Sequence, residues 1–133
     1  MRSAPALRSG ESPLPRRIGP VAITDIIRFA GAGGDFNPLH HDEATARAAG
    51  FDSVIAMGQF TVGLVAGFLT DWVGIENVRE LEVRFKAPVR VGDVVEVSAR
   101  VTETADGIAA IELTAEVAGI PVLTGNARAV VAS

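Results

Sequence analysis

The sequence predicts an α+β fold in which an antiparallel β-sheet wraps around one long central α-helix. The most apolar stretch, residues 54–73, contains a predicted helix from about Gly58 to Val73, and its all-round hydrophobicity indicates burial on most sides. Three later stretches alternate apolar with polar or charged residues, which is typical of half-buried strands. A sheet packed around a single helix that precedes most of its strands describes a hotdog fold.

The segments before this helix are shorter. Residues 1–17 are rich in Pro, Ser and Arg without periodicity, which predicts a loose terminal arm or an extended strand laid over the body. Thr24 is the expected N-cap of an amphipathic helix that ends at the glycines of residues 31–34. A second helix is expected over residues 43–49, with Asp42 as its N-cap.

The strands are predicted after the long helix, where the hydrophobic period changes to two. Their apolar positions are Leu81, Val83 and Phe85, then Val95, Val97, Ala99 and Val101, then Ile111, Leu113, Ala115 and Val117, with a last strand near Pro121–Val131. Turn residues at 88–93, 105–107 and 118–119 separate these stretches, which are expected to be half-buried antiparallel strands.

Composition limits the classes of function. A chain of 133 residues has the size of one domain, so a single domain over residues 1–133 is expected. The formal net charge is −4 and no basic cluster is interleaved with aromatics, so nucleic-acid binding is not expected. The absence of cysteine excludes disulfides and thiolate metal sites and suits a cytoplasmic protein. Polar residues within 54–73 disfavour a membrane span.

The loop over residues 34–42 carries the chemistry of the sequence. Asp35 and His40 lie five residues apart across Pro38, so turn geometry sets their relative position and can aim both at one point. Histidine exchanges protons near neutral pH, and an aspartate can orient it, share its water or act as an acid. Asn37 offers an amide that can hold a ligand or cap the loop.

Residue types alone leave two interpretations open, because Gly-Asp-x-Asn-Pro is also ordinary turn and capping chemistry. His41 is assigned to the surface, since only one of two adjacent histidines need point inward. A metal site made of Asp35, His40, His41 and Asp42 is disfavoured because adjacent histidines in an extended segment diverge.

The order and spacing of these residues resemble the MaoC-like, R-specific enoyl-thioester hydratase family over about fifty residues, 23–74. The family pattern runs Gly-Asp-x-Asn-Pro-x-His, then Gly-Phe, then Ile-Ala-His-Gly at the start of the long helix. The matching segments here are Gly34–His40, Ala49–Phe51, Ile55–Gly58 and, beyond the helix, Val83–Val89.

The resemblance implies a hydro-lyase that reversibly adds water to trans-2-enoyl thioesters, giving R-3-hydroxyacyl thioesters without a metal or other cofactor. It places the catalytic pair on Asp35 and His40 and the family's asparagine on Asn37. The backbone N–H of Gly58, at the positive end of the helix dipole, is the expected donor to the thioester oxygen. Simple close packing is the alternative reason for a glycine there.

One departure from the family pattern concerns the substrate. Met57 stands where the family usually has histidine, which predicts a changed pocket or a core-packing residue and leaves the acyl group open. Arg84, Lys86 and Arg90 are candidate contacts for the phosphates of coenzyme A or of an acyl carrier, with solvated surface charge as the alternative.

Two other functions compete with hydration. A hotdog thioesterase usually has a carboxylate on or near the central helix, where this chain has only Gln59 and, near the far end, Asp71. A non-catalytic subunit of a heterodimer would not need an intact Asp35 and His40. An exposed sheet edge, a helix in need of cover and the resemblance together predict a homodimer that acts on acyl-CoA or acyl-carrier thioesters.

Overall fold

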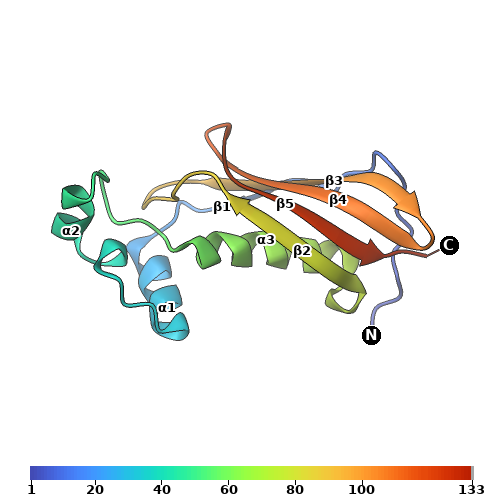
Figure 1. The fold of residues 1–133 in the computed structure, drawn as a ribbon, viewed down its shortest axis with the longest axis horizontal. Coiled ribbons are helices and arrows are strands. Elements are labelled where there is room, and N and C mark those ends of the chain that lie inside the picture. The colour runs from blue at the N-terminus through green and yellow to red at the C-terminus, as the bar shows by residue number, and fades with distance from the viewer. Residues whose placement is uncertain (133) are drawn as a thin grey trace.

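One long helix and one antiparallel sheet make up most of the structure. The computed structural model describes residues 1–132. The elements in chain order are β1 (Arg16–Ile18), α1 (Ile23–Gly33), the 3₁₀ helix η1 (Pro38–His40), α2 (Glu43–Ala48), α3 (Gly58–Val73), the 3₁₀ helix η2 (Ile75–Asn77), β2 (Val78–Phe85), β3 (Val95–Ala105), β4 (Ile108–Val117) and β5 (Ile120–Val130). The strand order is β1-β3-β4-β5-β2, and α3 lies along one face of the sheet (Figure 1). This is the predicted hotdog arrangement.

The core lies between α3 and the sheet. The inward-facing residues of β3 and β4 alternate with exposed ones, and Val97, Ile111 and Leu113 are at most 1% exposed. On α3 the buried residues are Thr61, Val65, Phe68, Leu69 and Val73. Phe60, Val62, Leu64 and Trp72 of α3 are only partly buried, so one chain alone does not complete the expected cover around the helix.

The hairpin turns follow the predicted positions. Asp106 and Ala118 have φ of 52° and 50°, and each precedes a glycine that also has positive φ. Two successive residues with positive φ are the signature of the type I′ turn, whose twist matches that of the strands it joins. Only glycine adopts such a φ without strain, and this explains Gly107 and Gly119.

The predicted N-cap of the first helix is wrong. Helix α1 begins at Ile23, so Ala22 is the N-cap and Thr24 lies within the first turn. The Asp25 carboxylate accepts a hydrogen bond from the Ala22 N–H at 2.9 Å, so a side chain of the first turn stabilises the start of the helix. The chain therefore does not need the Thr24 hydroxyl at this end. The N-cap at Asp42, by contrast, is as predicted.

The N-terminal arm lies extended along the free edge of β3. β1 pairs with Val95–Val97, and further back the Gly10 N–H donates to the Val101 carbonyl at 2.7 Å. The Arg16 guanidinium lies 2.9 Å from the Asp71 carboxylate and 5.4 Å from the centre of the Phe68 ring. Both partners belong to α3, so the arm also covers the outer side of that helix.

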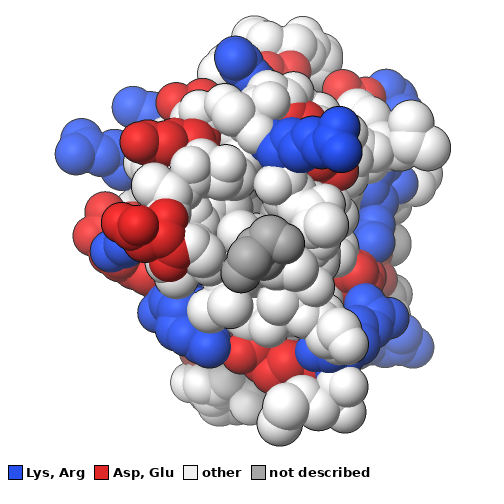
Figure 2. Space-filling view, turned by 90° about the vertical axis from the view of Figure 1, so that its right-hand side faces the viewer, with Lys and Arg blue, Asp and Glu red and all other residues white. Residues whose placement is uncertain are grey.

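Surface charge concerns nucleic-acid binding, and the length and apolar character of the helices concern membrane insertion. Figure 2 shows the end of the molecule where both termini lie, and there acidic and basic side chains alternate without gathering into a patch of one sign. Within residues 1–132, no helix combines the length and the apolar character that crossing a bilayer requires.

The register of the central hairpin predicts that two neighbouring substitutions change the free energy of unfolding by very different amounts. Leu113 faces α3 and is 1% exposed, whereas Glu112 faces solvent. Leu113→Ala is expected to lower the free energy of unfolding by about 2–5 kcal/mol, because it leaves a cavity. Glu112→Ala should change it by no more than about 0.5 kcal/mol. Urea denaturation followed by circular dichroism measures both, and equal losses would contradict this register.

Candidate active site

The loop between α1 and α2 brings Asp35 and His40 together. Asp35 Oδ2 lies 3.4 Å from His40 Nε2. The other carboxylate oxygen, Oδ1, accepts the backbone N–H of Asn37 at 3.2 Å, which orients the carboxylate. The His40 side chain is 8% exposed and that of Asp35 is 43% exposed, so the pair has one buried and one accessible member.

Local chemistry explains the shape of this loop. α1 ends at Gly34, whose φ of 68° is in the left-handed region, and the Asp35 N–H returns to the Ala30 carbonyl. Pro38 then starts η1, and the Asn37 side-chain oxygen caps it by accepting the Leu39 N–H at 3.1 Å. The structure thus uses the Asn37 oxygen to cap the loop, and a substrate contact through its amide nitrogen stays a prediction.

A backbone contact fixes the protonation pattern of His40. Its Nδ1 lies 2.7 Å from the carbonyl oxygen of Ile55. A carbonyl oxygen only accepts hydrogen bonds, so Nδ1 carries the hydrogen and the Nε2 of the neutral ring carries the lone pair. That lone pair is on the side of Asp35. His40 is therefore set to accept a proton at Nε2.

The same backbone segment connects the loop to α3. The Ile55 N–H donates to the Leu39 carbonyl at 3.1 Å, and the Ala56 N–H donates to the Val89 carbonyl at 2.8 Å. Gly58 follows three residues after Ile55, and three residues of extended chain span at most about 11 Å. The first turn of α3 must therefore lie close to the residue that holds His40.

The start of α3 is free of side-chain caps. Met57 is the N-cap residue and makes no side-chain capping bond, so the amides at Gly58 and Gln59 open the helix without a side-chain acceptor. Met57 is 5% exposed and belongs to the core, in line with the core-packing alternative. The uncapped donors at this helix end are backbone N–H groups.

His41 and Asp42, which follow His40 in the chain, interact with other groups. The exposed His41 lies with its Nε2 3.3 Å from the Phe36 carbonyl. Hydrogen bonds from the hydroxyl and the backbone N–H of Thr45 lower the pKa of Asp42, because they favour its charged form as the cap of α2. Among residues 1–132, no group of three or more His, Asp or Glu side chains is placed to hold a metal ion.

The three predicted phosphate contacts occupy different places, and their role stays a prediction. Arg84 alternates with Val83 and Phe85 along β2, so it lies on the sheet face opposite α3. Lys86 and Arg90 are exposed in the segment after β2. Arg90 forms an isolated β-bridge with Ile55, which puts its backbone beside the residue that holds His40.

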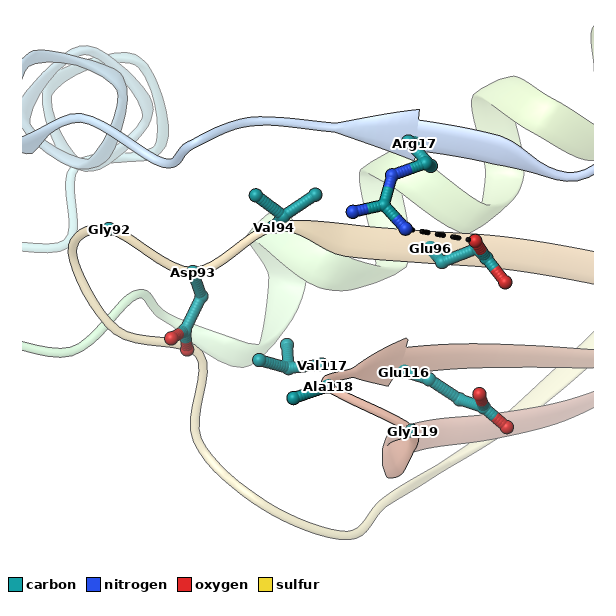
Figure 3. A pocket seen from close by; sticks show the side chains of 9 residues that line it. All are labelled: Arg17, Gly92, Asp93, Val94, Glu96, Glu116, Val117, Ala118 and Gly119. Atoms are coloured by element: carbon teal, nitrogen blue, oxygen red, sulfur yellow. Dashed lines mark hydrogen bonds and ion pairs between the residues drawn. The ribbon is translucent and has the colours of Figure 1, made fainter.

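A surface hollow lies away from the pair, at the ends of β1, β3 and β4 (Figure 3). Arg17, Glu96 and Glu116 are register partners across the three strands, and the Arg17 guanidinium lies 3.3 Å from the Glu96 carboxylate. Facing carboxylates repel each other across a sheet, and the guanidinium offsets this repulsion. These charges therefore have a structural explanation.

Two contacts of the site were not predicted from the sequence. The Ile55 carbonyl holds His40, but a backbone acceptor leaves no mark on residue type. Phe85 was assigned only as a strand residue, yet its ring lies against Gly58. The available signal was the glycine itself. The first position of a helix does not need glycine's backbone freedom, so a glycine there suggests a close neighbour.

Comparisons with known proteins identify the family of the chain. The family model described as "MaoC like domain" matches residues 6–120. The chain is 33% identical over 116 residues to the (R)-specific enoyl-CoA hydratase of Rhodospirillum rubrum, covering 84% of this chain and 80% of the relative. It is 36% identical over 86 residues to the 3-hydroxybutyryl-CoA dehydratase of Methylorubrum extorquens, covering 62% of this chain and 54% of that protein.

The solved structure of the unliganded R-hydratase PhaJ1 from Pseudomonas aeruginosa superposes with a TM-score of 0.85 at 26% identity, over 94% of this chain and 82% of that one. The fold and the loop thus define a hotdog protein with an Asp–His pair beside the start of its central helix. The chain belongs to the MaoC-like domain family.

The tautomer of His40 can be tested directly. At about pH 8, where an imidazole is neutral, His40 is expected to carry its hydrogen on Nδ1, because that atom donates to Ile55. Long-range ¹H–¹⁵N correlation spectra of ¹⁵N-histidine-labelled protein distinguish the two ring nitrogens. The exposed His41 is the internal reference, and a His40 hydrogen on Nε2 would contradict the assignment.

Proposed function

We propose that this protein catalyses the reversible hydration of trans-2-enoyl-CoA thioesters to R-3-hydroxyacyl-CoA thioesters, with Asp35 and His40 as its catalytic pair. The observation that carries the proposal is the placement of His40 Nε2 3.4 Å from Asp35 Oδ2, in a loop hydrogen-bonded to the segment that opens α3. Relatives named as enoyl-CoA hydratases and a 3-hydroxybutyryl-CoA dehydratase support the reaction class.

In the hydration direction, His40 Nε2 accepts a proton from a water that also hydrogen-bonds to Asp35. The water oxygen forms a bond to C3, the C2–C3 π bond breaks, and its electron pair moves toward the thioester carbonyl. A proton then reaches C2 from the pair and completes the product. Atoms and charge balance without a further reactant, and dehydration is the same path reversed.

Asp35 has two tasks in this scheme. It orients the water, and its charge stabilises the imidazolium that His40 becomes after accepting the proton. Nδ1 of that imidazolium continues to donate to Ile55, so the new proton on Nε2 faces Asp35. The carboxylate is partly exposed, which leaves it accessible to a substrate.

The charge that develops on the thioester oxygen needs a donor near the pair. The Gly58 N–H is at the positive end of the 16-residue helix α3, and no side chain caps that end. A backbone donor held in place before the reaction stabilises such an oxyanion without reorganisation. We assign this role to Gly58, and the nearby Lys86 and Arg90 to the coenzyme A phosphates.

Thioester hydrolysis has less support from the structure. The carboxylate that α3 carries, Asp71, is paired with Arg16 near the far end of the helix. Thirteen residues of helix separate it from Gly58, which corresponds to about 20 Å. Asp71 therefore lies too far from the Asp35 and His40 loop to act with it.

The catalytic pair predicts large effects for two single substitutions. Asp35→Asn and His40→Ala should each lower the turnover of crotonyl-CoA by at least about a hundredfold, because each removes one of the groups that hold the water. His41→Ala is the matched control and should retain wild-type turnover, since His41 is exposed. Loss of the enoyl-thioester absorbance measures hydration, and circular dichroism confirms folding.

Two outcomes would contradict the proposal. Full turnover in either Asp35→Asn or His40→Ala would exclude the pair as catalytic. Release of free thiol without hydration, measured in parallel with a thiol reagent, would indicate a thioesterase. Longer enoyl-CoA substrates are included, because the acyl chain length is open.

We also propose a homodimer. β2 is an edge strand of eight residues, so one row of its backbone donors and acceptors is unpaired within the chain. Several apolar residues of α3 are only partly covered. Size-exclusion chromatography with light scattering is expected to give twice the 13.8 kDa of one chain, and the mass of one chain across micromolar concentrations would contradict this.

A further inference from the structure

The ring of Phe85 occupies the space beside the first residue of α3. A Cβ atom built on Gly58 would lie 2.8, 3.0 and 3.2 Å from Cε1, Cζ and Cδ1 of that ring. Real Cβ atoms do not approach other atoms so closely, so no side chain fits at position 58 while the ring stays in place. Gly58 does not have a positive φ, and the backbone conformation therefore does not explain the glycine.

The sheet determines where this ring points. Phe85 is the last residue of β2 and alternates with Leu81 and Val83, which pack toward the core and α3. Phe85 nevertheless remains 56% exposed. One edge of the ring therefore lies against Gly58 while more than half of the residue is exposed within the single chain, beside a helix end whose first amides have no side-chain cap.

We infer that Phe85 is a positioning residue for hydration: its ring, seated on Gly58, shields the Gly58 N–H from water on one side and restricts the direction from which the thioester oxygen reaches it. This inference rests on the proposed function. An apolar wall next to a backbone donor lowers the local dielectric constant and strengthens the hydrogen bond to a developing oxyanion. Glycine at position 58 then leaves the ring room to keep this position.

The test is a double-mutant cycle on crotonyl-CoA hydration with Phe85→Ala, Gly58→Ala and the double variant. Phe85→Ala is expected to lower kcat about tenfold and to change KM less than about threefold, because the donor acts mainly in the transition state. Gly58→Ala should cost about a hundredfold in the wild-type background but less than about tenfold when residue 85 is alanine, since the collision with the ring is gone. Ile75→Ala, which removes an exposed apolar side chain at the opposite end of α3, is the matched control and should leave kcat unchanged.

A merely structural role would lower the melting temperature without this pattern, so kcat is normalised to folded protein. An unchanged kcat in Phe85→Ala, a rise in KM alone, or additive effects of the two substitutions would overturn the inference. If Phe85→Ala does not fold, Phe85→Leu decides: reduced kcat supports the role, and unchanged kcat overturns it. Wild-type protein that hydrates neither crotonyl-CoA nor longer enoyl-CoA thioesters would instead overturn the proposed function.

Discussion

The hydrogen bond from His40 Nδ1 to the Ile55 carbonyl is the contact on which the site depends. At 2.7 Å it joins a loop that lies beyond the sheet to the segment that opens α3, and the bond between Ile55 N–H and the Leu39 carbonyl reinforces it. It buries the ring, sets its tautomer and turns Nε2 toward Asp35. Because the acceptor belongs to the backbone, these effects do not require a particular side chain at position 55.

The fold was largely predictable because its main signals are periodic. The bounds of α3 follow from its apolar run, and the positions of the four long strands follow from alternation. The positions of the two hairpin turns follow from glycines after short polar or small residues. The cap of α1 was not predictable from residue preference. Thr24 and Asp25 are both good candidates at a helix start, and the choice depends on which backbone groups Asp25 reaches.

The site was predictable only in part, for a related reason. Asp35 and His40 stand out by residue type, and the resemblance of their segment to the MaoC-like pattern favours a catalytic pair over an ordinary turn. The contacts that make them useful link residues far apart in sequence, as between His40 and Ile55 or Gly58 and Phe85. Such contacts depend on how the loop and β2 pack around the start of α3, and local patterns do not contain that information.

The helix starts in this chain differ in whether a side-chain oxygen caps them. Side-chain oxygens close the first turns of the three helices that precede α3 in the chain: Asp25 in α1, Asn37 in η1 and Asp42 in α2. The long helix α3 has no such cap, although a capping side chain typically contributes about 1 kcal/mol. Burial of Val65, Phe68 and Leu69 can offset that loss, because each buried large apolar side chain contributes about 1.5–3 kcal/mol. A capping oxygen would also occupy the backbone donors that an oxyanion needs, so the helix best able to fold without a cap is the one whose amides are left for a ligand.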